Sequence, residues 1–323
     1  MTSAITLSPT PNSGPSWQTR LVHRLVAARM RPHARKPIDP LWVRANMGKP
    51  QAARRLMAHA TGAHFGRMAA TGTWPGGETV VCPRAARLPH GDAPALLYLH
   101  GGGFIACSPE THRPLVGSLV RRLGARAWVP QYRLAPEHPY PAALDDALGA
   151  YHYLLAEAGV NPARLVVAGD SAGGGLALSL MLAVRDRGWP LPAAVVTYSP
   201  WTDMAATGPS LDENSERCAM FAGETIRRAA PLYVGAGNAR DPLVSPLYGD
   251  FRGLPPLLVH ASTDEVLRDD AVRVAERARA HGVAVELTLW QRVPHVWQFF
   301  AAVIPEARDS LERTRQFVAR HLG

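Results

Sequence analysis

The sequence predicts an α/β fold in which a mostly parallel central sheet is flanked by helices and carries a helical cap. Three observations predict this class. From about residue 65 onward, short apolar runs alternate with segments whose apolar residues recur at helical spacing. The chain has 323 residues, of which 47% are hydrophobic, so it can bury a large core. Residues 204–240 break the alternation, which indicates a helical insertion into a single core.

The N-terminal part of the chain is expected to be irregular first and helical afterwards. Residues 1–16 are rich in Ser, Thr, Pro and Asn, a composition typical of disorder. Apolar residues then recur with arginines between them, which predicts a basic amphipathic helix. A membrane surface would suit such a helix, but packing over the rest of the protein is the commoner outcome. A second short helix is predicted over 50–60, begun by Pro50. The first helix carries Trp17, Leu21, Leu25 and Ala28, interleaved with Arg20, Arg24 and Arg31.

Six apolar runs further along the chain are predicted to be buried strands. They lack the polar alternation of a half-exposed strand, so both of their faces should be covered, as in a parallel sheet. The runs span residues 95–100, 127–132, 164–169, 193–199, 257–262 and 283–290.

Helical segments between these runs complete the expected core. The segment 141–159 places Leu144, Leu148 and Tyr151 on one face and stops at Gly159. The resulting division gives N-terminal cap helices at 17–62 and a cap insertion at 204–240. The catalytic core then comprises residues 63–203 and 241–323.

Composition excludes several classes of protein. The net charge of +9 is carried mostly by arginines, interleaved with acids except near the N-terminus, and no basic stripe with stacking aromatics is present. We therefore expect no nucleic-acid partner. No run of about 18 apolar residues occurs, so no membrane span is expected, and the absence of a secretory pattern favours the cytoplasm. Cys82, Cys107 and Cys218 show no metal-type spacing and are expected to be reduced thiols.

The pentapeptide "GDSAG" at 169–173 places Ser171 between an apolar strand and a helix. A tight turn at such a junction forces its central residue into a strained backbone conformation and pushes the side chain outward. Gly169 and Gly173 are then required, because a Cβ at either position would collide where strand and helix converge. Alone the pattern is weak, but its position predicts Ser171 to be a nucleophile on a strand–turn–helix elbow.

A second motif, "YLHGGGF" at 98–104, also follows a predicted strand. Successive glycines let the backbone approach a substrate closely and aim N–H groups at one point. Donors of this kind stabilise the oxyanion of an acyl-transfer intermediate by ~3 to 4 kcal/mol each. The predicted donors are the amides of Gly102 and Gly103, completed by Ala172 at the start of the following helix. His100 and Gly101 belong to this oxyanion loop, where His100 is expected to be structural.

The base and the orienting acid are expected later in the chain, each after a strand. His295 is the one histidine in a loop after the last strand with a helix ahead, whereas His260 lies inside a strand. Asp264 lies just past the run 257–262, where a buried orienting carboxylate belongs. Glu265, Asp269 and Asp270 are rivals, but they are assigned to the solvated face of the following helix.

With these residues in place, the chain resembles the hormone-sensitive-lipase-like family of α/β-hydrolases. "HGGGF", "YRLAPEHPYPAALDD", "GDSAGG", "SPWTD", "DEVLRDD" and "PHVW" occur in that family's order, from about residue 75 to the end. The resemblance implies Ser171 as nucleophile, His295 as general base and acid, Asp264 as its partner, and an oxyanion loop at 101–103. It also implies a cap made from the N-terminal helices and the insertion. The C-terminal part is more loosely similar to bacterial monoterpene lactone hydrolases.

Two positions depart from the family pattern. Gly175 stands where the family usually has Asn, which is expected to loosen the start of the nucleophile helix. Trp297 stands where Phe is common and is expected to add bulk beside His295. Phe104, in the oxyanion-loop motif, and Trp297 are the candidates for lining the substrate pocket.

The function that these residues predict is hydrolysis of short-to-medium acyl carboxylic esters by a serine carboxylesterase through an acyl-enzyme. A lactone hydrolase with the same three residues is the alternative within this chemistry. A non-catalytic small-molecule receptor, as plant gibberellin receptors of the same family are, would lack the histidine that His295 supplies here, and a dehydratase is a third class. No cofactor or metal is implied. The expected partner is a small ester or lactone, and a homodimer is open.

Overall fold

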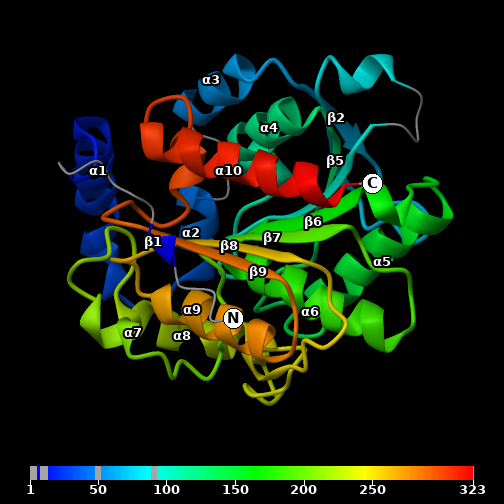
Figure 1. Cartoon of the computed structure of the whole chain (residues 1–323). Helices are drawn as coiled ribbons and strands as arrows, with labels where there is room; N and C mark the ends of the chain where they lie inside the picture. Colours follow the sequence, from blue (N-terminus) through cyan, green and yellow to red (C-terminus); the bar gives the residue numbers. More distant parts are fainter. Residues whose placement is uncertain (1–5, 8–13, 48–51, 89–92, 323) are drawn as a thin grey trace.

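The computed structural model describes residues 6–7, 14–47, 52–88 and 93–322, and it has the predicted α/β architecture (Figure 1). A nine-stranded sheet has the order β1-β9-β8-β7-β6-β4-β5-β3-β2. All neighbouring strands are parallel except β2 with β3 and β3 with β5. The strands are β1 (Thr6–Leu7), β2 (His64–Met68), β3 (Gly77–Val81), β4 (Ala95–Leu99), β5 (Arg126–Pro130), β6 (Leu165–Asp170), β7 (Ala194–Tyr198), β8 (Leu257–Ser262) and β9 (Val285–Trp290).

Ten α-helices occur in the described part of the chain, and those of the core cover both faces of the sheet. In Figure 1, α4 and α10 lie over one face, and α5, α6 and α9 lie over the other. The helices are α1 (Trp17–Ala34), α2 (Pro40–Met47), α3 (Ala52–Ala60), α4 (Pro109–Leu123), α5 (Ala142–Ala156), α6 (Ala172–Asp186), α7 (Ser210–Glu213), α8 (Gly223–Val234), α9 (Arg268–Ala280) and α10 (Pro305–His321).

The six predicted strands correspond to β4–β9, with ends that differ by at most two residues. Their apolar runs are continuous because helices bury both faces, which is the reason the sequence signal was clear. The antiparallel pair β2 and β3 was not predicted, since β2 is mostly exposed and carries the mixed sequence "HFGRM". The predicted disorder over 1–16 and the helix start at Pro50 lie largely outside the described residues.

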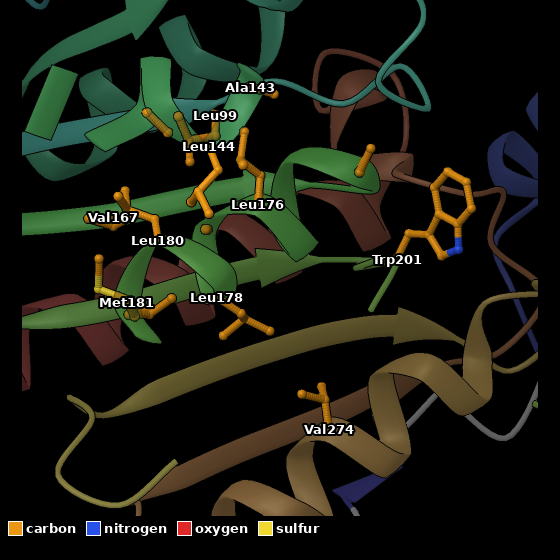
Figure 2. Packing of buried hydrophobic residues seen from close by; sticks show 14 of the residues in the cluster. Leu99, Ala143, Leu144, Val167, Leu176, Leu178, Leu180, Met181, Trp201 and Val274 are labelled. Atoms are coloured by element: carbon orange, nitrogen blue, oxygen red, sulfur yellow. The ribbon is translucent and has the colours of Figure 1, made fainter. Parts of the chain in front are cut away.

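Two hydrophobic cores result, one on each face of the sheet. Figure 2 shows part of the first, in which Leu176, Leu180 and Met181 of α6 pack against Leu99 and Val167 of the strands. The second core lies under α4 and α10 and includes Leu115, Leu119, Leu311 and Phe317. Burying side chains of this size stabilises the fold by about 1.5–3 kcal/mol each before entropy is counted. The carboxyl ends of the central strands are thereby held rigidly.

The insertion and the N-terminal helices contact one another. Ala34, at the end of α1, accepts a hydrogen bond from Thr225 of α8, and Arg35 O accepts one from Arg228 at 2.8 Å. Arg31 pairs with Glu216 of the insertion at 2.6 Å. No helix in the described part of the chain is long and apolar enough to cross a membrane.

Candidate active site

Ser171 lies on a strand–turn–helix elbow, as predicted. Its backbone has φ 53° and ψ −124°, in the left-handed half of the map that L-residues rarely adopt. It directly follows β6 and precedes α6. A Cβ on Gly169 would lie 2.2 Å from Gly173 O, and one on Gly173 would lie 2.1 Å from Leu99 O. The expectation that both glycines are sterically required is therefore confirmed.

Gly175 is also required, for a reason that the sequence did not indicate. A Cβ at this position would lie 2.0 Å from the carbonyl oxygen of Trp201. The first turn of α6 therefore packs directly on the backbone that follows β7. Gly175 is buried in this contact and leaves no room for a larger side chain. The expected loosening of the nucleophile helix is wrong, because α6 is continuous from Ala172 to Asp186 and its first turns are buried.

The oxyanion loop lies beside the elbow because β4 and β6 are parallel neighbours. Leu99 pairs with Gly169 at the ends of these strands. Gly102 and Gly103 have φ of 126° and 64°, and a Cβ on Gly102 would lie 2.2 Å from Ala106 O. Within the described ranges, no hydrogen bond uses the amides of Gly102, Gly103 or Ala172, whereas the amide of Gly101 donates to Asp170 Oδ1 at 3.0 Å. The three predicted donors therefore have no hydrogen-bond acceptor among the described residues.

A buried polar cluster beneath this loop was missed in the sequence. Asp170, which directly precedes Ser171, accepts hydrogen bonds from Gly101 N and, at 2.7 Å, from Tyr98 Oη. His112 Nε2 of α4 lies 3.2 Å from its Oδ1. Burial would raise the pKa of Asp170, but His112, Tyr98 and the Gly101 amide together hold this pKa below its ordinary value. The one available signal was the acidic residue inside the "GDSAG" motif.

His100 has a structural position, as expected. Its side chain is fully buried, and its ring stacks on Tyr132 with centroids 4.2 Å apart. Its Nδ1 lies 2.9 Å from Gly101 O. Burial, helped by the nearby His112, lowers the pKa of His100 to about 3, so the ring is neutral near pH 7. The ring supports the loop without adding charge to it.

His295 lies in the loop after β9, and Glu265 holds it. Its Nδ1 is 2.6 Å from Glu265 Oε2, and both side chains are buried, with 4% and 1% of their surface exposed. An ionised carboxylate only accepts, so Nδ1 carries the proton and donates it. The other carboxylate oxygen of Glu265, Oε1, accepts from Ser262 N at 2.7 Å. His295 Nε2 is buried and has no hydrogen-bond partner among the described residues.

This arrangement corrects the predicted partner of His295 from Asp264 to Glu265. Asp264 instead accepts from Thr263 Oγ1 at 2.7 Å. The prediction failed because helix α9 begins at Arg268, so Glu265 lies in the buried turn before it. Asp269 and Asp270 do lie in α9, but Asp270 is buried rather than solvated. It accepts from Thr202 N and Asp203 N, at 2.7 and 2.8 Å.

The loops that carry Ser171 and His295 meet at the end of β7. Ser171 N donates to Tyr198 O at 2.8 Å. The next residue along the chain, Ser199, accepts a hydrogen bond at its Oγ from Val296 N at 3.4 Å. The end of β7 therefore contacts both the elbow and the histidine loop, and β7 lies between β6 and β9 in the strand order β9-β8-β7-β6.

The two candidate lining residues have different environments. Phe104 is buried and stacks on Tyr233 of the insertion, with centroids 3.6 Å apart. Trp297 is fully buried in the core under α10, where its indole N–H donates to Glu306 O at 3.1 Å. The expectation that Trp297 adds bulk beside the His295 site is wrong, because its ring contacts Trp290 and its polar atom is satisfied inside the core.

Two further aromatic side chains, Phe221 and Trp201, pack against residues of the site. Phe221 packs edge-on against His295, with centroids 5.2 Å apart. Trp201, which follows β7, belongs to the first core (Figure 2) and lies 6.3 Å from the Phe104 ring between centroids. Its indole N–H is buried without a partner among the described residues. A cavity of about 470 Å³ lies elsewhere, between β3, β5 and the end of α5, and shares no residue with this site.

Known proteins with similar sequences and structures are ester hydrolases. The model of the α/β-hydrolase-fold family Abhydrolase_3 matches residues 96–299. An acetyl-hydrolase of Streptomyces hygroscopicus is 42% identical, over 72% of this chain and 77% of its own. The carboxylesterase/phospholipase LipF of Mycobacterium tuberculosis is 38% identical, over 72% of this chain and 63% of its own.

Solved structures give the same result over nearly the whole chain. A crystal structure of EstE5, soaked with p-nitrophenyl butyrate, matches with a TM-score of 0.85 and 33% identity, over 95% of this chain and 99% of that one. A crystal structure of an esterase from the bacterial hormone-sensitive lipase family matches with a TM-score of 0.81, at 36% identity and the same coverage. This chain therefore belongs to the hormone-sensitive-lipase family of α/β-hydrolases and is a carboxylester hydrolase.

Proposed function

We propose that the protein hydrolyses short-to-medium acyl carboxylic esters through an acyl-enzyme formed on Ser171. His295 is the general base and acid, Glu265 orients it, and the amides of Gly102, Gly103 and Ala172 form the oxyanion hole. The observation that carries this proposal is the buried Glu265–His295 pair with Nε2 left unpartnered, in the loop adjoining the Ser171 elbow. A histidine fixed in this tautomer is prepared to accept a hydroxyl proton.

The chemistry then runs in two halves. Ser171 Oγ attacks the ester carbonyl as its proton passes to His295 Nε2, and the resulting oxyanion is stabilised by the three amides. The tetrahedral intermediate breaks its C–O bond to the alcohol, which leaves with the proton from Nε2. Water then attacks the acyl-enzyme carbonyl as one of its protons passes to Nε2. The second tetrahedral intermediate breaks its C–Oγ bond, and Nε2 returns the proton to Ser171 Oγ as the acid leaves.

Glu265 has two interactions that suit it to orient His295. Its Oε2 fixes the Nδ1 proton, and its Oε1 is held by the Ser262 amide, so the carboxylate cannot rotate freely. When Nε2 takes the serine proton, the imidazolium forms beside a buried negative charge, which stabilises it.

The proposed substrate size follows from how the cap is attached. Arg44 of α2 donates from Nε to Ile105 O at 2.7 Å and from a terminal nitrogen to Ala135 O at 2.8 Å, which ties α2 to the segment just after the oxyanion loop and to the loop after β5. Phe221 and Tyr233 of the insertion pack on His295 and Phe104. A pocket roofed in this way accommodates modest acyl groups, and longer chains must be strained or left in water. A relative named acetyl-hydrolase is consistent with this size.

The test combines labelling with a substrate series. A fluorophosphonate should label Ser171, and Ser171→Ala should keep its fold while losing nearly all activity toward p-nitrophenyl esters. Turnover of the wild type should be highest for short and medium acyl chains and fall steeply for long ones. Labelling at another residue, or an active Ala variant, would overturn the assignment. Faster turnover of lactones than of open esters would assign the lactone alternative instead.

A further inference from the structure

The N-terminal helices carry most of the large apolar side chains that the described part of the chain exposes. Trp17, Leu21 and Leu25 of α1 are 64%, 48% and 62% exposed. Three more large apolar residues are exposed on α2 and α3. In the rest of the described ranges, only Leu88 and Val303 are large apolar residues that are exposed. Those on the next two helices are Leu41, Trp42 and Leu56. Such a concentration marks an interaction surface rather than the scattered exposure of an ordinary surface.

The three apolar residues of α1 form one continuous stripe. They are spaced four residues apart, so they share a face of the helix. The opposite face is fixed to the body of the protein, because Val22 and Thr19 are buried and Thr19 Oγ1 donates to Glu306 of α10 at 2.6 Å. We call the exposed face with Trp17, Leu21 and Leu25 the α1 stripe.

Arginines flank the α1 stripe on both sides. Arg20 and Arg24 precede its leucines by one position, Arg29 follows it, and all three are exposed. None of the three has an acidic partner among the described residues, whereas Arg31 and Arg35 at the end of the helix both pair with Glu216. The flanking charges are thus available to an anionic ligand.

The charge of the whole chain is concentrated in the same region. The first 77 residues hold 11 of the 35 Lys and Arg residues and one of the 26 acidic residues, Asp39. The other 246 residues hold 24 basic and 25 acidic residues and are nearly neutral. The high pI therefore reflects a basic N-terminal region and not a uniform bias.

We propose that the α1 stripe docks on an anionic lipid bilayer surface. Trp17, Leu21 and Leu25 would enter the boundary between headgroups and acyl chains, while the flanking arginines meet lipid phosphates with their aliphatic stems buried. A nucleic acid would bind the arginines through its phosphates, but it would not bury the two exposed leucines in an apolar environment. A second copy meeting this face in a two-fold pairing would set the same unpaired arginines against one another. The bilayer is the occupant that uses both features.

The test is co-flotation of the full-length protein with phosphatidylcholine vesicles, with and without phosphatidylglycerol. The wild type should bind the phosphatidylglycerol vesicles and bind pure phosphatidylcholine much more weakly. The double variant Arg20→Gln/Arg24→Gln should lose about 25-fold in affinity at low salt, since each basic residue near an anionic surface contributes about fivefold. Leu21→Glu/Leu25→Glu should abolish binding.

Val303→Glu is the matched control, because Val303 is 47% exposed but lies outside the N-terminal helices. It should bind vesicles like the wild type. Hydrolysis of a soluble p-nitrophenyl ester should be unchanged in all variants, which shows that each is folded. Failure of the wild type to bind, or unchanged binding by the leucine variant, would overturn the proposal. A dimer in sedimentation that Leu21→Glu/Leu25→Glu dissociates, or duplex DNA binding that survives this change, would also overturn it.

Discussion

Replacing Glu265 by Gln tests the proposed site most directly, because it alters one atom of a buried pair. Oε1 accepts from the Ser262 amide and Oε2 accepts from His295 Nδ1. In the variant, the carboxamide oxygen would keep the hydrogen bond from the Ser262 amide. The carboxamide NH₂ group would then face Nδ1. Nδ1 would then have to accept, and the imidazole proton would move to Nε2. The opposite orientation is no better, since it points NH₂ at a backbone N–H.

The magnitude follows from this change of tautomer. A histidine protonated on Nε2 cannot take the proton of Ser171, and the equivalent Asp-to-Asn change in serine proteases lowers kcat by about 10⁴. We expect Glu265→Gln to lose about 10³- to 10⁴-fold in kcat, about 4 to 5.5 kcal/mol in the barrier. KM for p-nitrophenyl butyrate should change little, because Glu265 is only 1% exposed and acts through His295.

Asp264→Asn is the matched control for this experiment. Asp264 is adjacent in sequence but accepts from Thr263 and not from His295. Its replacement should change kcat less than about threefold. Thermal unfolding and near-UV circular dichroism would establish that both variants are folded. If Asp264→Asn were the inactive variant and Glu265→Gln remained active, the assignment of the orienting carboxylate would be refuted.

Two further predictions concern stability. Gly175→Asn should lower the free energy of unfolding by about 3 kcal/mol or more, because its Cβ would meet Trp201 O. The control Gly188→Asn has open space and a φ of 66° that Asn tolerates, and denaturant titration should show it unchanged. Burial, opposed by the Thr202 amide, raises the pKa of Asp270 to about 8, so the folded state binds a proton that the unfolded chain releases near pH 4. Wild-type stability should therefore fall relative to Asp270→Asn as pH rises, by ~3 kcal/mol between pH 5.5 and 8. Parallel pH profiles for the two proteins would contradict it.

The parts of this protein that the sequence determined are those set by local interactions. The strands β4–β9 were visible because burial on both faces requires continuous apolar runs. The elbow and the oxyanion loop were visible because their backbone requires glycine at fixed offsets from Ser171 and His100. His295 could be selected because it alone follows the last strand in a loop.

The environment of the N-terminal helices and of Trp297 was decided by the tertiary structure. The amphipathic pattern of α1 indicated which residues lie on one face, but its apolar stripe faces outward because the smaller residues Thr19 and Val22 pack on the body. Trp297 follows His295 by two residues, yet it lies in the core under α10. The Trp297 side chain therefore packs in the core between the sheet and α10 and does not lie beside the histidine ring.

The sequence by itself determined that a carboxylate after β8 would meet a histidine after β9, and the tertiary structure decided which carboxylate. Asp264 and Glu265 are neighbours in the same turn, and composition and spacing do not separate them. The Ser262 amide fixes Glu265 Oε1, and the position of His295, thirty residues later in the chain, fixes Oε2. Adjacent side chains in a turn point in different directions, so the choice depends on long-range contacts that no local pattern records.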